Sequence, residues 1–218
     1  MHRFISILLT GLIGFVILSG DASAQSEKTA AGKRNVLFIV SDDLNCDLGC
    51  YGHYLVKSPN IDRLAKRGVL FENAYCQYPV CNPSRSSFMT GCYPDQTGVL
   101  SNGGNLRNAL PDVVTMPQLF QKHGYFVARV GKIFHQGVPP EIGQDGLDDA
   151  ASWDLAINPA GVDIEVDERI VSIVPPEHDK RNFGGTLSWL RLDSDEAHTD
   201  EIGAAVAERL LNEYHPEK

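Results

Sequence analysis

Basic residues are scarce in this chain, which has 19 Lys and Arg against 28 Asp and Glu and a formal net charge of −9. A protein that binds nucleic acid by neutralising phosphates needs a basic stripe, and the sequence contains none, so we expect no nucleic-acid partner. Internal repeats and low-complexity tracts are also lacking, which excludes a repeat architecture. With 218 residues, of which 43% are hydrophobic and 22% charged, the composition is that of an ordinary globular protein.

Long apolar runs are confined to the N-terminus, where one extends over Phe4–Leu18. This run is shorter than the roughly 20 residues that a spanning helix needs, and small residues of the Ala-x-Ala kind follow it at positions 22–24. The pattern predicts a signal peptide over residues 1–24, cleaved before Gln25, rather than a retained membrane anchor. We therefore expect an exported protein, periplasmic or secreted, with no stable membrane anchor and a flexible mature N-terminus over residues 25–34.

Cysteines are few and odd in number: Cys46, Cys50, Cys76, Cys81 and Cys92. An odd count in an exported chain leaves one thiol free, modified or paired with another molecule, and permits up to two disulfides whose pairing the sequence does not assign. A second close pair of the kind found in zinc sites is lacking. An N-glycosylation sequon is also lacking, which is more typical of a bacterial envelope protein than of a lysosomal glycoprotein.

Short apolar runs alternate with helical patterns along the rest of the chain. This alternation predicts an α/β fold with a mixed or mostly parallel sheet and helices on both faces. The expected strands are 35–40, one that starts at 69–71 and runs toward 74–75, and 125–130. The expected helices are 61–67, one that begins near Pro83 and ends at Gly91, 114–123 and 199–214. Between Gln136 and about Ser194 the chain is rich in turn residues, which is typical of a pocket mouth and also of surface decoration.

Reactive and charged side chains follow three of the expected strands. Asp42 and Asp43 come after the first, Cys81 after the second and its loop, and Lys132 with His135 after the third. The carboxyl ends of parallel strands meet at one edge of a sheet, so these side chains can share a site. Adjacent aspartates on a regular strand point to opposite faces, so both can converge only where the strand breaks into a loop, and a hard cation such as Ca²⁺ or Mg²⁺ would relieve their repulsion.

Each of these residues also has an ordinary structural interpretation. Asp42 can cap a helix, Lys132 and His135 can be an exposed loop pair, and Cys81 can be a buried or disulfide-bonded cysteine. The position of Cys81 shortly before Pro83 is compatible with chemistry, because the positive end of a helix stabilises thiolates and oxyanions, but taken alone the pattern favours the structural interpretation. Only the combination of the three groups favours a catalytic site.

Residues 81–85 read Cys-Asn-Pro-Ser-Arg and residues 89–91 read Met-Thr-Gly. These motifs resemble the signature of the type I sulfatases, whose cysteine is oxidised to formylglycine. The other matching stretches are Ser41-Asp42-Asp43, Ser58-Pro59-Asn60-Ile61-Asp62-Arg63-Leu64-Ala65, Gly49-Cys50-Tyr51-Gly52 and Gly131-Lys132-Ile133-Phe134-His135-Gln136-Gly137. The last two are most similar to the iduronate-2-sulfatase branch, and the resemblance is clearest from about Asn35 to Gly137.

The resemblance implies an alkaline-phosphatase-like α/β fold, with residues 35–218 as the N-terminal part of a sulfatase catalytic domain. It implies that Asp42, Asp43 and modified Cys81 bind Ca²⁺ in preference to Mg²⁺. As an aldehyde hydrate, residue 81 would attack sulfur with one hydroxyl, and its second hydroxyl would then lose a proton and expel sulfate. The implied partners are a formylglycine-generating enzyme and a sulfated carbohydrate, such as a sulfated uronic acid in a polysaccharide.

The resemblance also assigns roles to three basic residues. Arg85 would stabilise the modified side chain, Lys132 would contact the sulfate, and His135 would orient or deprotonate the hydrate. Family members are longer, and their later half supplies further metal ligands and catalytic groups that we do not find between residues 138 and 218. We therefore expect this chain alone to bind calcium weakly and to hydrolyse sulfate esters poorly.

Two alternatives to the sulfatase interpretation remain. A phosphodiesterase or phosphonate-ester hydrolase could use the same modified residue, because sulfate and phosphate esters share a tetrahedral geometry. An inactive, truncated sulfatase-like protein could retain only a binding or structural role. The chemical state of residue 81 and the ester preference distinguish these three interpretations.

Overall fold

The computed structural model describes residues 34–138, 140–162, 170–172, 188–190 and 197–213. The chain divides into two units, residues 1–37 and residues 38–218. The four described residues of the first unit carry no helix or strand, and all elements named below belong to the second unit. The expected signal peptide and residues 25–33 lie outside the described residues.

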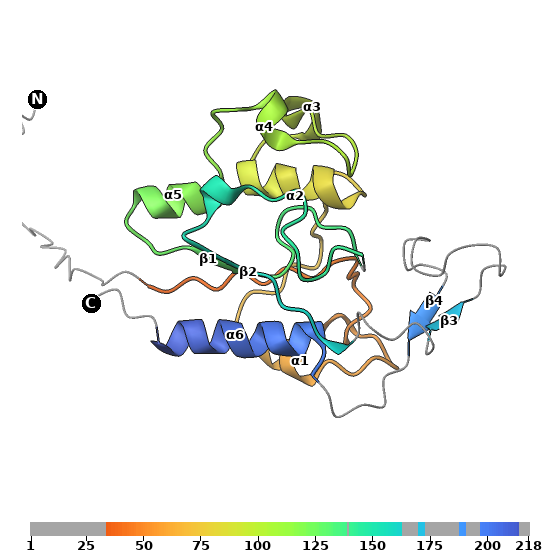
Figure 1. The fold of residues 1–218 in the computed structure, drawn as a ribbon. Helices are drawn as coiled ribbons and strands as arrows, with labels where there is room; N and C mark the ends of the chain where they lie inside the picture. The colour runs from red at the N-terminus through yellow and green to blue at the C-terminus, as the bar shows by residue number, and fades with distance from the viewer. Residues whose placement is uncertain (1–33, 139, 163–169, 173–187, 191–196, 214–218) are drawn as a thin grey trace, which may run out of the picture. The chain divides into compact units, whose positions relative to one another are not determined.

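Helices account for most of the regular structure of the second unit (Figure 1). In chain order they are η1 (Gly49–Tyr51), α1 (Pro59–Ala65), α2 (Cys81–Thr90), α3 (Pro94–Thr97), α4 (Leu106–Ala109), α5 (Met116–Lys122), η2 (Ala150–Ser152) and α6 (Thr199–Glu213). The predicted helices at 61–67, 114–123 and 199–214 are confirmed as α1, α5 and α6, with residue 214 beyond the described part. Local signals account for these helices: Pro59 occupies the first turn of α1, and Thr115 forms a capping box with Gln118 at the start of α5.

Helix α2 begins at Cys81, two residues before the predicted start near Pro83, and ends at Thr90, directly before Gly91 as predicted. Gly91 follows it in the left-handed conformation, with φ of 72°, and its N–H donates to the Ser87 carbonyl at 2.8 Å. Glycine adopts this conformation without the steric cost that a Cβ brings, which explains why the helix ends here. The helix is buried along much of its length, so its first turn is held firmly beside the candidate site.

Strands in the described part of the chain are short. β1 (Ala128–Val130) pairs in parallel with β2 (Leu155–Ile157), in the register Ala128–Leu155 to Val130–Ile157. β3 (Ile170–Ser172) and β4 (Ser188–Leu190) form a separate antiparallel pair. Helix α6 packs against β1, and Figure 1 shows the β1–β2 pair between α5 and α6. The parallel pair and its surrounding helices confirm the α/β class.

Two of the predicted strands are wrong. Residues 35–40 and 69–71 contain no strand, and the third prediction, 125–130, shortens to β1. Ile39 is 75% exposed and Val69 80% exposed, so neither run is buried as the patterns indicated. A strand requires a neighbouring strand to pair with its backbone groups, and the described residues provide none beside these two runs.

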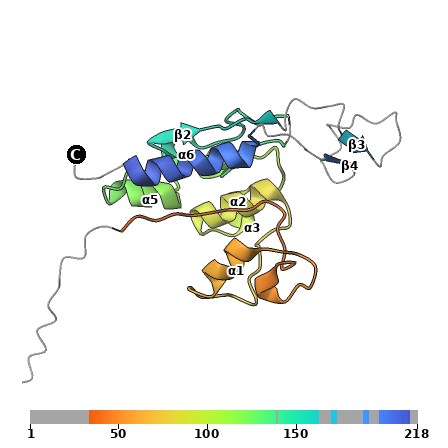
Figure 2. The ribbon, with the colours of Figure 1, turned by 90° about the horizontal axis from the view of Figure 1, so that it is seen from below.

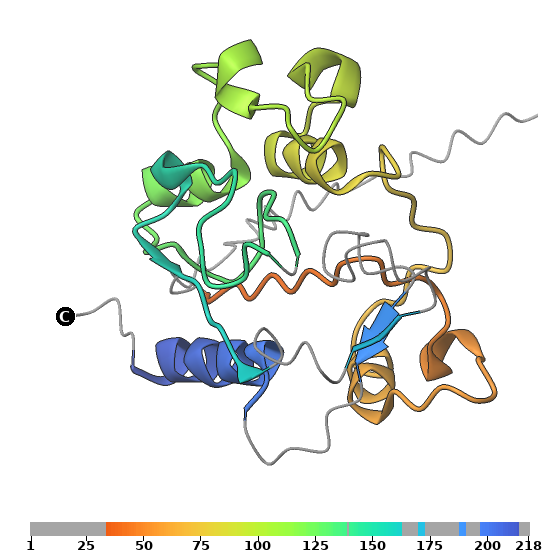
Figure 3. The same ribbon diagram turned by 45° about the vertical axis from the view of Figure 1, so that its right-hand side comes forward.

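The buried core of the second unit is formed by α2 and by the segments that follow it. Its centre consists of Met89, Val99, Leu106 and Phe134. Partly buried side chains pack around this centre: Phe88, Leu110, Val113, Met116, Ile133 and Trp153. Helices α2 and α3 lie side by side in Figure 2, and Figure 3 shows α1 next to η1, both pairs being in contact.

None of the helices in the described part of the chain combines the length and the apolar character needed to cross a bilayer. The core instead positions one end of α2, which carries Cys81, close to the loops that carry the predicted charged residues.

Candidate active site

Two aspartates and a cysteine form the centre of the candidate site. One ligand atom from each of Asp42, Asp43 and Cys81 lies within 4.8 Å of the other two. Asp43 has φ of 54°, the left-handed conformation that a non-glycine residue rarely adopts. This break in the extended backbone lets two adjacent carboxylates lie on the same side, where a regular strand would separate them.

Cys81 occupies the first position of α2 and is half-buried. Val80, in an extended conformation, precedes it as the N-cap residue and offers no side chain that could cap the helix. The positive end of the helix therefore faces the region of residue 81, where it favours negative charge on that residue or on a bound oxyanion.

Arg85 lies one turn further along α2 and joins three parts of the site. Its side chain is 4% exposed, and Nη2 donates to Asp42 Oδ1 at 3.0 Å. Nη1 donates to the carbonyl oxygens of Lys132 and Ile133 at 3.0 and 2.8 Å. The planar fork of guanidinium donors suits this arrangement, because one group can bind acceptors on two segments at once.

Lys132 completes the charge balance around Asp42. Its Nζ lies 2.6 Å from Asp42 Oδ2, so each oxygen of this carboxylate faces a cation. Burial alone raises the pKa of the Asp42 carboxyl, but the hydrogen bonds from Lys132 and Arg85 outweigh it and hold that pKa below its ordinary value. Asp42 is therefore ionised at neutral pH and is available as an anionic ligand.

His135 is half-buried beside these charges, and its Nδ1 is buried without a hydrogen-bond partner among the described residues. Burial lowers the pKa of His135, and the positive charge of Lys132 lowers it further. The imidazole is therefore neutral at pH 7, the form that can accept a proton. The structure thus brings together five of the six predicted residues through direct contacts or short distances, and places His135 within the field of Lys132, Arg85 and Asp42.

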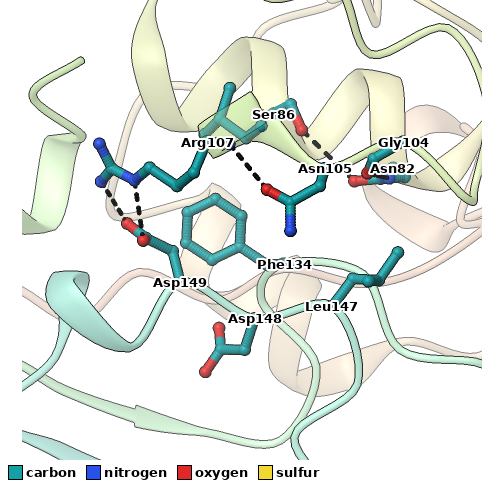
Figure 4. Close-up of a pocket in the computed structure, with 10 residues that line it drawn as sticks. Asn82, Ser86, Gly104, Asn105, Arg107, Phe134, Leu147, Asp148 and Asp149 are labelled. Atoms are coloured by element: carbon teal, nitrogen blue, oxygen red, sulfur yellow. Dashed lines mark hydrogen bonds and ion pairs between the residues drawn. The ribbon is translucent and has the colours of Figure 1, made fainter. Parts of the chain in front are cut away.

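A network that sequence reasoning missed lies beside α2. Arg107 donates through Nε and Nη2 to the two carboxylate oxygens of Asp149, at 2.9 and 2.6 Å (Figure 4). The Ser152 hydroxyl donates to the same carboxylate. Burial raises the pKa of the Asp149 carboxyl, but the hydrogen bond from Arg107 outweighs it and keeps Asp149 charged. These partners are 42 positions apart in sequence, so no local pattern could have indicated them.

A second missed network holds the loop that carries Lys132 and His135. Arg129, whose side chain is 3% exposed, contacts Asp145 and Asp148 and donates to the carbonyl oxygen of Gly131. The backbone of His135 forms a bridge with Leu147, its carbonyl accepting from the Leu147 N–H at 2.7 Å. The signal available in the sequence was Arg129 itself, a basic residue within an otherwise apolar strand pattern. A buried arginine needs hydrogen-bond acceptors, so its presence indicated acidic or carbonyl partners.

All five cysteines are free thiols, so the two disulfides that the sequence allowed do not form in this structure. Cys81 therefore has no disulfide partner, and its sulfur is free for modification.

A comparison with family models matches the Sulfatase family over residues 34–158. This span covers more than half of the chain and includes all six candidate residues. The chain belongs to the sulfatase family.

Curated sulfatases show the same relationship at the level of individual sequences. The chain is 44% identical to "Iduronate 2-sulfatase" of Mus musculus over 127 residues, which cover 58% of this chain and 23% of that protein. It is 46% identical to "Iduronate 2-sulfatase" of Homo sapiens over 123 residues, covering 56% and 22%. A "Sulfatase" of Formosa agariphila is 38% identical over 144 residues, covering 62% and 28%. The chain thus spans about a quarter of the length of these relatives.

The donor set fits a hard divalent cation. Asp42 and Asp43 supply carboxylate oxygens, and a formylglycine hydrate at position 81 would supply oxygen where the thiol now offers sulfur. Because Arg85 and Lys132 already contact Asp42, a cation at this site would share that carboxylate with both side chains.

Proposed function

We propose that this sulfatase chain takes part in the hydrolysis of sulfate esters through a formylglycine made from Cys81. The observation that supports this most strongly is the cluster of Asp42, Asp43 and Cys81 at the start of α2, with Arg85 bridging it to the Lys132 loop. Transfer of a sulfuryl group to a hydrate suits this combination of acidic, basic and nucleophilic groups, because the negative charge on the sulfate oxygens must be balanced on several sides.

The chain's own residues have distinct tasks in this proposal. A hydroxyl of the residue 81 hydrate forms a bond to sulfur while the bond from sulfur to the alcohol oxygen breaks, and the alcohol leaves. The second hydroxyl then loses its proton, the aldehyde re-forms, sulfate departs, and water restores the hydrate. Neutral His135 accepts a proton, Lys132 balances sulfate charge, and Arg85 holds residue 81 and Asp42 in place.

A divalent cation, Ca²⁺ in preference to Mg²⁺, would be held by Asp42, Asp43 and the oxygens of residue 81. When bound, such a cation polarises a sulfate oxygen and lowers the pKa of the hydrate. We propose further that the protein is exported, with residues 1–24 removed, and that a formylglycine-generating enzyme modifies Cys81 during maturation.

The proposed substrate is a sulfated uronic acid or a polysaccharide that contains one. Support comes from the relatives, two of which are named iduronate 2-sulfatases. A panel of 2-sulfated uronate disaccharides, aryl sulfates, aryl phosphates and phosphonate esters tests this choice. Preference for phosphate or phosphonate esters would replace the sulfatase proposal with the phosphodiesterase alternative.

The decisive test is peptide mass spectrometry of residue 81 after co-expression with a formylglycine-generating enzyme. We expect the peptide to carry the aldehyde, and C81A to abolish ester hydrolysis. C92S is the matched control, since Cys92 lies just beyond the other end of α2. An unmodified thiol at position 81 would favour a sulfatase-like protein without catalysis.

A further inference from the structure

The first turn of α2 has no cap from its own N-cap residue. Pro83 lacks an N–H, and the Ser84 N–H donates to the Val80 carbonyl at 3.1 Å. The Asn82 N–H instead donates to the side-chain Oδ1 of Asn102 at 3.2 Å. The acceptor that a serine or aspartate at the N-cap ordinarily supplies therefore comes from a loop twenty positions away.

The side chain of Asn82 makes the reciprocal contact with the same loop. Its Nδ2 lies 3.2, 3.2 and 2.7 Å from the carbonyl oxygens of Ser101, Asn102 and Gly104. Its Oδ1 accepts from the Ser86 hydroxyl at 3.3 Å, and the residue is 3% exposed (Figure 4). A buried carboxamide with every polar atom paired rigidifies its surroundings, because an alternative position would leave donors unsatisfied.

The bond between Asn82 and Asn102 acts directly on residue 81. The peptide unit that joins Cys81 to Asn82 is planar. Fixing the direction of the Asn82 N–H therefore also fixes the orientation of this plane, which is set by the ψ dihedral of Cys81. That dihedral helps to set where the side chain of residue 81 points relative to Asp42 and Asp43. Arg85 holds the same helix from the opposite segment, through Asp42 and the Lys132 loop.

We propose that Asn82 and Asn102 are positioning residues, and that their reciprocal contacts orient residue 81 toward the two aspartates. This Asn82–Asn102 clasp replaces a helix cap and deepens the proposed function, on which it rests, because it concerns the orientation of the same nucleophile. It acts through residue 81 and requires no contact with substrate.

The first test uses the formylglycine form and an aryl sulfate. N102A removes the acceptor from an exposed side chain, so little packing is lost. We expect kcat to fall about tenfold with KM within about twofold, since small displacements of a reacting group reduce the rate of the chemical step. N102D, which keeps an acceptor oxygen, should recover most of this loss, and N108A, at an exposed asparagine on α4, should have no effect.

The second test does not require sulfatase activity. In the unmodified protein, site-resolved mass spectrometry follows alkylation of Cys81 and Cys92 by iodoacetamide. We expect N102A to accelerate alkylation of Cys81 about threefold or more, because the freed Asn82 N–H can stabilise a thiolate and the sulfur samples more orientations. The rate at Cys92 should not change, and N102D should behave as the wild type.

The outcomes separate the two proposals. Acceleration at Cys81 in a protein without sulfatase activity would retain the clasp and overturn the proposed function. If the protein hydrolyses sulfate esters but N102A changes neither kcat nor the rate of Cys81 alkylation, the proposed function would be retained and the clasp overturned. Equal acceleration at Cys81 and Cys92 would indicate general loosening of α2 and would also overturn the clasp.

Discussion

Arg85 is 3% exposed and binds acceptors on two segments that lie far from it in sequence. Its charge is balanced by Asp42, and its remaining donors reach two main-chain carbonyls. This one side chain therefore couples the start of α2 to Asp42 and to the Lys132 loop.

We predict that R85K destabilises the fold by about 2–3 kcal/mol, because lysine cannot satisfy acceptors in two directions and leaves buried groups unpaired. Denaturant unfolding measures this change. R63K, at an exposed arginine of α1, serves as the control and should have little effect. Equal stability of R85K and R63K would contradict the role assigned to Arg85.

His135 provides a prediction about pH. Its pKa lies below the ordinary value because burial and then Lys132 disfavour the protonated ring. K132M removes the positive charge of Lys132, so the pKa of His135, measured as the midpoint of an imidazole NMR titration, should rise. If neutral His135 accepts the proton, activity should be lost as pH falls through this pKa. A midpoint that does not move in K132M would contradict the electrostatic explanation.

At the scale of elements, helix α2 ends at a local signal, the glycine that follows its last residue. Gly91 has φ of 72°, and open space surrounds the position that a Cβ would occupy, so only the backbone conformation opposes a side chain there.

We predict that G91A lowers the free energy of unfolding by about 1–2 kcal/mol, the cost of the left-handed conformation for a residue with a Cβ. Thermal or denaturant unfolding measures it. Gly103 also has open space at its Cβ position but no positive φ, so G103A should change stability by less than about 0.5 kcal/mol. A similar loss in both variants would show that conformation at position 91 is not the cause.

Helix boundaries were largely predictable from the sequence, whereas strands were not. Pro83, Gly91 and the Thr115–Gln118 box act on neighbouring residues, so their effects are visible in a local pattern. A strand requires a partner, and the apolar run at 35–40 lacks one among the described residues. Its pattern correctly showed apolar character, but pairing is a property of the neighbouring segment.

At the scale of the whole molecule, the described residues gather fewer oxygen ligands than a tight calcium site contains. Asp42, Asp43 and residue 81 would provide only part of the roughly 6–8 ligands that Ca²⁺ takes.

We therefore predict that the 218-residue chain binds Ca²⁺ with a Kd of about a millimolar or weaker, and that it hydrolyses aryl sulfates slowly. Isothermal titration calorimetry measures the binding, with D43N as the variant that should abolish it and D47N as an acidic control nearby in sequence. Submicromolar binding or rapid turnover would contradict the prediction.

The sequence by itself determined the helix that presents Cys81, the set of six candidate residues and the sulfatase signature around them. These depend on residue types and short spacings, which local backbone preferences and side-chain chemistry express directly. Only the tertiary structure decided that Arg85 and Lys132 share Asp42, that a left-handed Asp43 brings both carboxylates together, and that Asn102 caps α2 from a distant loop. Such contacts depend on how segments far apart in the chain fold against one another, because buried polar groups must find partners wherever the fold supplies them.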